Sequence, residues 1–380
     1  MNIDVRLLRY LDKLLVLVIL ALIAAGVVAV STAALGYTGS AALADSFVKK
    51  QIIAAVIGFV LLILILLFDY SEFAHLHKVF YGLNILMLGA VLVMGKITNG
   101  AQSWIPLGPV QIQPSEFGKV LLILTLGNQL SRMDKLTGIR DLIGPALHVL
   151  PLLVLLGLQP DVGTALVFVV ITAAMVYVAG FPGWKLALMG GSPIALVAGW
   201  FYAHLKWKVS MWPLGDWQVK RLEVFVDPAK DLTGDGWHVM QSKIAIGSGG
   251  LWGRGLYHGT QTQLGYLPEQ HTDFVFSVIG EEIGFLRGGL PLLLLYLVLL
   301  WRIMATAATS KDRYGALIAT GVAAMLGFHV LQNIGMTLGV MPVTGIPLPF
   351  VSYGGSAMMT NIVAIGLVLN VGMRRQTLMF

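Results

Sequence analysis

The hydrophobic and polar positions of this chain alternate between long apolar segments and short polar connections. Segments of roughly 17 to 25 apolar residues are long enough to cross a bilayer as helices. By this criterion the pattern predicts about ten membrane-spanning segments. They lie near 14–32, 52–68, 79–95, 116–130, 142–159, 162–180, 186–204, 273–301, 315–339 and 357–373. The prediction is an all-α polytopic membrane protein with a single membrane domain over 1–380.

Two stretches interrupt this alternation. Residues 205–271 form a long polar loop between the seventh and eighth segments, and tryptophans within it argue against disorder. We expect short amphipathic helices there, lying at the membrane interface. Residues 339–356 hold three prolines and four glycines without a charge, which prevents a continuous helix. This second stretch predicts a re-entrant or capping loop beside a cavity, although an ordinary turn explains the same spacing.

Composition supports the membrane assignment. Hydrophobic residues make up 57% of the chain and charged residues 12%, whereas soluble domains carry about 25% charged residues. The chain has no cysteine, which excludes disulfides and thiolate chemistry. The net charge of +6 is divided among connections between spans, which leaves no contiguous basic surface for nucleic acid.

Lysine and arginine gather in every second connection, which predicts the orientation. Members of this group are Arg9, Lys13, Lys78, Arg132, Lys185, Arg302 and Arg374. The bias predicts that both termini lie in the cytoplasm and that the loop 205–271 is extracytoplasmic.

The eighth segment begins with carboxylates, at Asp273, Glu281 and Glu282. Ionisable groups at membrane depth are costly and usually mark function. Thr272 is the predicted N-cap, which places Asp273 in the first helical turn. Positions 273, 277 and 281 would share one helix face. Asp273 is therefore expected at the outer membrane boundary, within reach of a half-soluble substrate.

Two further polar groups belong to the fourth and sixth segments. Glu116 and Lys119 are three residues apart on a helix, so they can pair. This pair is either a neutralising ion pair inside the bundle or a site where Lys119 also meets an anionic substrate group. Asp161 follows Pro160 and is expected to cap the sixth segment, on the same outer side as Asp273.

The long loop offers groups that suit a pyrophosphate. Arg221 and Lys243 supply cations, and the glycine-rich run 247–255 offers backbone N–H groups. No Walker-type lysine follows these glycines. The histidines lack metal-ligand spacing, so no structural zinc is expected.

Several motifs, in order along nearly the whole chain, resemble the SEDS family of shape, elongation, division and sporulation proteins. They are RLEVFVDP at 221–228, QSKIAIGSGG at 241–250, GTQ at 259–261, LPEQHTDF at 267–274 and FVSYGGS at 350–356. The short N-terminal tail is more similar to the elongation branch of this family than to its division branch.

The resemblance implies a ten-helix peptidoglycan glycosyltransferase that polymerises lipid II at the outer face of the bacterial inner membrane. The family's essential aspartate corresponds to Asp273, its Glu/Lys pair to Glu116 and Lys119, and its QPDxGT motif to 159–164. We therefore take Asp273 as the catalytic residue. The substrate-binding candidates from motifs and loop cations are Glu116, Lys119, Asp161, Arg221, Gln241, Lys243, Thr260, Gln261 and Ser352. The implied partner is a class B penicillin-binding protein, a transpeptidase docking beside helices eight and nine.

In the mechanism that follows, Asp273 acts as general base for the acceptor sugar's 4-hydroxyl, and undecaprenyl pyrophosphate leaves with inversion. Lys119, Arg221 and Lys243 are the candidate cations for the leaving group. Mg²⁺ or Mn²⁺ held by Asp273 or Asp161 is left open, and no organic cofactor is expected. A helix N-terminus would lower the pKa of Asp273, whereas burial and Glu269 would raise it.

Two other functions fit the same hydropathy. A lipid II flippase would use Glu116, Lys119, Glu281 and Glu282 to line a translocation path. A non-catalytic scaffold would only recruit the transpeptidase and membrane lipids around it. Neither function needs an ordered set of polar motifs on one outer face.

Overall fold

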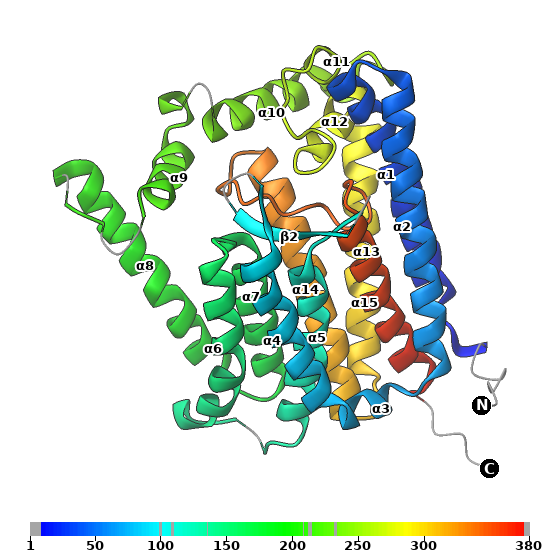
Figure 1. The fold of residues 1–380 in the computed structure, drawn as a ribbon, viewed down its shortest axis with the longest axis vertical. Coiled ribbons are helices and arrows are strands. Elements are labelled where there is room, and N and C mark those ends of the chain that lie inside the picture. The colour runs from blue at the N-terminus through cyan, green and yellow to red at the C-terminus, as the bar shows by residue number, and fades with distance from the viewer. Residues whose placement is uncertain are drawn as a thin grey trace.

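The computed structural model describes residues 9–98, 101–107, 110–134, 136–207, 209–211, 215–231 and 234–375. Long helices run side by side in a bundle (Figure 1). They are α1 (Lys13–Thr38), α2 (Ala41–Leu67), α4 (His77–Met94), α5 (Pro114–Ser131), α6 (Ile143–Leu158), α7 (Val162–Val178), α8 (Gly183–Trp207), α13 (Leu290–Ala308), α14 (Arg313–Thr337) and α15 (Gly355–Met373). Nine of the ten predicted segments correspond to one helix each, whereas 273–301 is broken before α13. The all-α fold class is confirmed.

Shorter elements connect these helices. They are α3 (Tyr70–His75), α9 (Asp216–Val226), α10 (Asp235–Gly249), α11 (Thr260–Gln263), α12 (Val275–Glu282), the 3₁₀ helices η2 (Ile139–Leu142) and η3 (Pro228–Lys230), and the π-helical η4 (Phe285–Gly289). Within the described part of the chain, eight helices are long and apolar enough to cross a membrane, and α7 is a shorter apolar helix.

The centre of the bundle is α14, which contacts α5, α7, α13 and α15. A helix that is apolar on every side is stable only when it is surrounded. Residues all round α14 are buried, including Leu317, Val322 and Leu326. By contrast, α8 packs against α7 and is exposed along most of its length. In Figure 1 it leans away from the other long helices at one edge.

The short helices predicted within the long loop 205–271 are present. The segments α9, α10 and α11 form over 205–271, and α10 packs against α12 with Val239, Ser242 and Ala245 buried. In Figure 1 α10, α11 and α12 lie at the upper end of the bundle, whereas α3 lies at the lower end. Since α10 contacts α12 and α14, and α11 contacts α1, these two helices are folded onto the bundle.

The sequence did not predict the small antiparallel sheet between α4 and α5. Its strands are β1 (Lys96–Thr98), β2 (Ala101–Leu107) and β3 (Val110–Ile112), paired in that order. Alternating polar and apolar positions are few in strands this short, so the pattern gives little signal. The strand β2 contacts α4 and α5, and β3 contacts α15.

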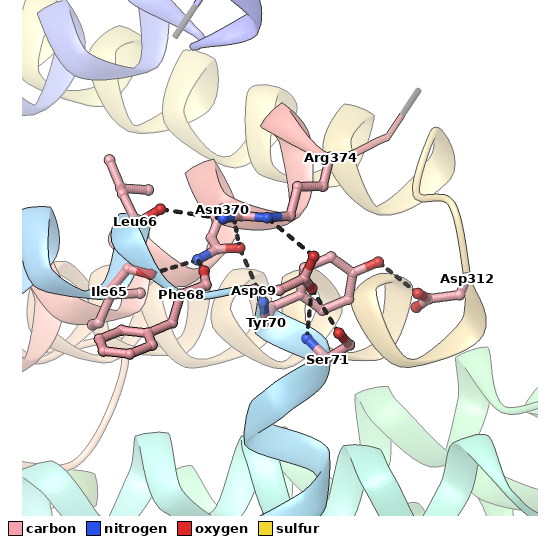
Figure 2. Close-up of polar contacts among 9 residues, drawn as sticks. All are labelled: Ile65, Leu66, Phe68, Asp69, Tyr70, Ser71, Asp312, Asn370 and Arg374. Carbon is pink, nitrogen blue, oxygen red and sulfur yellow. Dashed lines mark hydrogen bonds and ion pairs between the residues drawn. The ribbon is translucent and has the colours of Figure 1, made fainter. Parts of the chain in front are cut away.

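A polar network joins helix ends at the lower end of the bundle (Figure 2). The hydroxyl of Tyr70 donates to Asp312, which is the N-cap of α14. The amide of Asn370 donates to the carbonyls of Ile65 and Phe68, at distances of 2.7 and 2.8 Å. Arg374 also pairs with Asp69 at 3.2 Å. These bonds tie α2, α14 and α15 together far from Asp273.

Candidate functional site

Asp273 lies in a tight turn just before α12, which begins at Val275. Glu269 adopts a left-handed φ of 46°, and its carbonyl oxygen accepts from the amides of Thr272, Asp273 and Phe274. The hydroxyl of Thr272 donates to the same carbonyl at 3.2 Å instead of capping a helix. The predicted N-cap at Thr272 is therefore wrong, because the turn closes around Glu269 before the helix starts.

Contacts from three other parts of the chain anchor this turn. Gln270 donates to the carbonyl of Ala33 on α1 at 2.7 Å. The amide of Tyr353 donates to the carbonyl of His271 at 2.9 Å. Asn333 on α14 donates to the carbonyl of Asp273 at 2.8 Å. The position of Asp273 is thus set by residues that are distant in sequence.

Asp273 as a whole residue is half-buried in this packed turn. A Cβ added to Gly345 would lie 3.4 Å from its Oδ2, so the backbone of 339–347 passes close by. Burial raises the pKa of Asp273 to about 7, and the negative charge of Glu269 acts in the same direction. A hydrogen bond from Thr272 and the charge of Arg221 oppose them. The sequence left open whether a helix N-terminus would lower the pKa of Asp273 or burial would raise it. In the structure burial is the largest influence, and the pKa is raised.

A polar cavity lies beside residues 344–347, with about 290 Å³ of space that is partly open to solvent. Among its lining residues are Glu116, Lys119, Asp161, Thr164, His329 and Gly345. Since Gly345 also faces Asp273, the cavity wall adjoins the carboxylate. The structure therefore brings Asp273, the Glu/Lys pair and Asp161 to one region.

The Glu116–Lys119 pair forms as predicted, with its Nζ–Oε1 distance at 2.7 Å and both side chains almost fully buried. Lys119 also contacts Nε2 of His329 at 3.1 Å. Within the described residues, Glu116 Oε2 and His329 Nδ1 have no hydrogen-bond partner. The sequence analysis did not select His329. The signal was its polar side chain within the apolar segment 315–339.

Asp161 caps α7, which confirms its predicted local role. One carboxylate oxygen accepts from the amide of Thr164 at 3.0 Å, and the other accepts from the Thr164 hydroxyl at 2.8 Å. The same carboxylate lines the polar cavity. Asp161 therefore caps α7 and lines the polar cavity at the same time.

A second hollow lies beside residues 339–343, with about 310 Å³ of space that is partly open to solvent. Its lining is mostly apolar and includes Val224, Phe225, Val239 and Met341, with Arg221 as the cation. Arg221 Nε lies 3.4 Å from Asp235 Oδ2. The side chain of Lys243 packs against Gly339, at one end of this hollow's wall. Both loop cations therefore lie near the 339–343 backbone.

The glycine-rich run does not form the predicted pyrophosphate cradle. The amides of Arg254 and Gly255 donate to the carbonyls of Glu281 and Glu282, and the amide of Gly253 donates to Gly249. In turn, the carbonyls of Gly250 and Leu251 accept from the first amides of η4. The helix breaks between α12 and η4. The glycine-rich run packs at this break, and its hydrogen bonds link the end of α12 to the start of η4. The predicted continuous helix over 273–301 is accordingly wrong.

Glu281 and Glu282 accept hydrogen bonds from residues 257–263, which precede the turn of Asp273 in the chain. Glu281 accepts from the amides of Gln261 and Thr262 at 2.8 and 3.0 Å, and also from the hydroxyls of Thr260 and Thr262. Glu282 accepts from the Tyr257 amide at 2.9 Å. The hydrogen bonds of these two carboxylates therefore serve to fix the 257–263 loop.

Of the remaining candidates, Ser352, Thr260 and the backbone amide of Gln261 have local partners, whereas the buried Oε1 of Gln261 has no hydrogen-bond partner within the described residues. Ser352 accepts from the amide of Leu348 at 2.8 Å, which closes a turn in the second irregular stretch. Gln241 is buried in α10. Thr260 and Gln261 bond to Glu281. Their contacts are those of residues that shape the loops around the turn of Asp273.

Carboxylates and imidazoles do not gather into a metal-binding group within the described parts of the chain. No cluster of three or more His, Cys, Asp or Glu could hold an ion there. Both oxygens of Asp161 are engaged by Thr164. The side chains present do not fit a metal held by the protein alone, so no chemical step is assigned to Mg²⁺ or Mn²⁺.

Comparison with known proteins identifies relatives of this chain. A family model described as cell cycle protein, covering FtsW, RodA and SpoVE, matches residues 12–377. The peptidoglycan glycosyltransferase MrdB of Escherichia coli is 40% identical over 299 residues, 78% of this chain and 78% of MrdB.

Solved structures are similar over nearly the whole chain. One is described as structural coordination of polymerization and crosslinking by a peptidoglycan synthase complex. It has a TM-score of 0.79 at 35% identity, covering 96% of this chain and 98% of that one. The rod shape determining protein RodA of Thermus thermophilus has a TM-score of 0.71 at 33% identity, covering 97% and 98%.

Proposed function

This chain belongs to the FtsW, RodA and SpoVE family of cell cycle proteins, and we propose that it polymerises lipid II with Asp273 as the general base. It is a peptidoglycan glycosyltransferase, the activity for which its relatives MrdB, RodA and FtsW are named. One observation carries the proposal. The half-buried Asp273, with its pKa raised to about 7, adjoins the wall of the polar cavity and is acted on by the charge of Arg221, which lines the apolar hollow.

The proposed step is a single displacement. The 4-hydroxyl of the acceptor sugar gives its proton to Asp273 while its oxygen attacks the anomeric carbon of the donor. The bond from that carbon to the diphosphate breaks, and undecaprenyl pyrophosphate leaves with inversion. A base works best when its pKa is near the working pH, which agrees with the raised pKa of Asp273.

The two hollows suit the two chemical parts of lipid II. Arg221, at the apolar hollow, and Lys243 beside it are the cations proposed for the diphosphate, with the apolar wall toward the isoprenoid. Lys119 is already neutralised by Glu116, so its cavity suits sugar hydroxyls better than a second anion. Mg²⁺ or Mn²⁺ would assist only by offsetting the diphosphate's charge.

We further propose that the upper end in Figure 1 faces outward from the bacterial inner membrane, with both termini in the cytoplasm. The partner is a class B penicillin-binding protein that docks beside α13 and α14. The structural similarity to a chain of a peptidoglycan synthase complex supports such a partner. The similarity to MrdB and to RodA supports a role in elongation and cell shape.

The test measures glycan polymer made from fluorescent lipid II by the purified protein with its transpeptidase. Asp273→Asn keeps the shape of the side chain but cannot accept the proton. We expect polymer formation to fall about 10²- to 10⁴-fold, while lipid II binding persists. Asp45→Asn, at an exposed carboxylate paired with Lys49, is the control and should keep full activity.

Polymer at the wild-type rate from Asp273→Asn would refute the catalytic role and favour the scaffold. Lipid II transport without polymer by the wild-type protein would favour the flippase. Repeating the assay with EDTA tests the metal separately, since a metal requirement would abolish polymer in the wild type.

A further inference from the structure

The buried side chain of Asn333 joins the turn of Asp273 to the wall of the polar cavity. Asn333 lies on α14 with 0% of its surface exposed. Its Nδ2 donates to the carbonyl of Asp273 at 2.8 Å and to the carbonyl of Ile346 at 2.8 Å. Ile346 lines the polar cavity together with Gly345. The side-chain amide of Asn333 thus bonds both to the turn that carries Asp273 and to the wall of the polar cavity.

The orientation of this amide follows from its partners. Both partners are carbonyl oxygens, which only accept hydrogen bonds. A flipped Asn333 would set its own oxygen against them, so only the NH₂ group can occupy this place. No shorter or apolar side chain can donate to both carbonyls at once.

Neighbouring polar side chains of α14 act on the same region. Gln332 donates to the carbonyl of Pro342 at 2.8 Å. His329, one helical turn before Asn333, contacts Lys119. Polar side chains of α14 therefore bind the 342–346 backbone, the turn of Asp273 and the cavity lysine. Of these, Asn333 alone bonds to Asp273 itself.

We propose that Asn333 is a positioning residue for glycosyl transfer, because it holds the Asp273 turn against the 344–347 wall of the polar cavity. The proposal rests on the function proposed above. A displacement of about 1 Å at a reacting group can cost 10²-fold in rate. Loss of the Asn333 amide leaves two carbonyls without their shared donor and frees the turn to move.

Such a movement has a signature that lost stability alone would not give. The charged groups that act on Asp273 are Glu269 in its own turn, Arg221 on α9 and Asp235 on α10. The nearest titratable group on α14 is His329, which faces Lys119. A turn that relaxes toward water loses burial, so its carboxyl would ionise at lower pH. The acidic side of the pH–rate profile should then move to lower pH.

The experiment compares Asn333→Ser and Asn333→Leu with matched changes at Asn370. Asn370 is also a buried asparagine whose Nδ2 donates to two carbonyls, but it lies at the opposite end of the bundle (Figure 2). The assay uses the full protein with its transpeptidase and fluorescent lipid II. It records kcat, KM, the pH–rate profile and Tm for each variant.

We expect kcat of the Asn333 variants to fall about 10- to 100-fold with KM nearly unchanged, and their profile to move to lower pH. The Asn370 variants should lose Tm but keep the wild-type profile. If Asn333→Leu does not fold, Asn333→Ser, which adds no bulk, decides the outcome. Asn333 variants that lose only Tm, with kcat and profile unchanged, would overturn the proposal. Absence of polymer from the wild-type protein would instead count against the proposed function.

Discussion

At the residue scale, the carboxylate of Asp273 is adjusted by burial more than by neighbouring charge. Burial is the largest cause of its raised pKa, ahead of Glu269. The positive charge of Arg221 counteracts part of the effect, but the pKa remains raised. A carboxylate that a cation held fully ionised would be a weak base, so this balance suits proton transfer.

The pH dependence of glycan formation tests this balance. The base must be ionised, and its pKa is about 7, so the rate should fall as the pH drops below about 7. Arg221→Gln removes a cation that lowers this pKa, which should move the fall in rate to higher pH. Initial rates across the neutral range measure both effects.

Lys49→Gln is the control, because Lys49 pairs with Asp45 at an exposed place on α2. Its profile should match that of the wild type. A wild-type rate that stays constant through the neutral range would contradict the assignment of Asp273 as the group that titrates.

At the element scale, the break between α12 and α13 depends on close backbone contact. Gly284 has a left-handed φ of 85°, and a Cβ there would lie 2.2 Å from the amide nitrogen of Gly253. A Cβ on Gly253 would lie 2.4 Å from the carbonyl oxygen of Glu282. Within the run 247–255, Gly249 and Gly253 are therefore the glycines that packing against α12 and the break requires.

Gly253→Ala should destabilise the protein by about 1–3 kcal/mol, since its φ of 79° disfavours alanine and its neighbour is rigid backbone. Thermal unfolding in detergent measures this loss. Gly247→Ala is a matched control inside α10, where an added Cβ meets nothing within 4 Å. That change should stabilise the helix by about 0.5–1 kcal/mol. Equal Tm values for the two variants would refute the packing argument.

At the scale of the whole molecule, the two ends of the bundle differ in chemistry. The upper end carries Asp273 and its two hollows, whereas the lower end holds the network of Tyr70, Asp312, Asn370 and Arg374. Between them, α14 is buried and α13 keeps an exposed apolar face that includes Leu294 and Leu297. That face is available to lipid or to a partner helix.

Partner docking at α13 predicts that Leu297→Trp weakens the complex. Leu297 is 63% exposed, so the larger side chain does not disturb the core but would alter a helix–helix contact. Co-purification of the transpeptidase should fall, and polymer formation should fall with it. Leu196→Trp on α8, where the leucine is 73% exposed, is the control. Equal recovery of the partner with both variants would exclude this docking face.

Features that depend on neighbours along the chain could be predicted from the sequence. The length of an apolar segment determines whether it can span a bilayer as a helix, so the predicted helical segments were found except that 273–301 is broken at Gly284. Residues three apart on a helix meet whatever surrounds them, which is why the Glu116–Lys119 pair formed as expected. The cap formed by Asp161 is equally local.

Only the tertiary structure decided how distant segments meet. The turn of Asp273, the helix break at Gly284 and the bonds from Asn333 each join residues far apart in the chain. Hydropathy carries no information on such contacts, because it describes how each segment meets solvent or lipid. The sequence by itself thus determined which segments form the long helices of a membrane protein and which carboxylate to examine. The packing of α14, α10 and the 339–347 backbone determined the surroundings that give this carboxylate its raised pKa, because burial belongs to the assembled bundle.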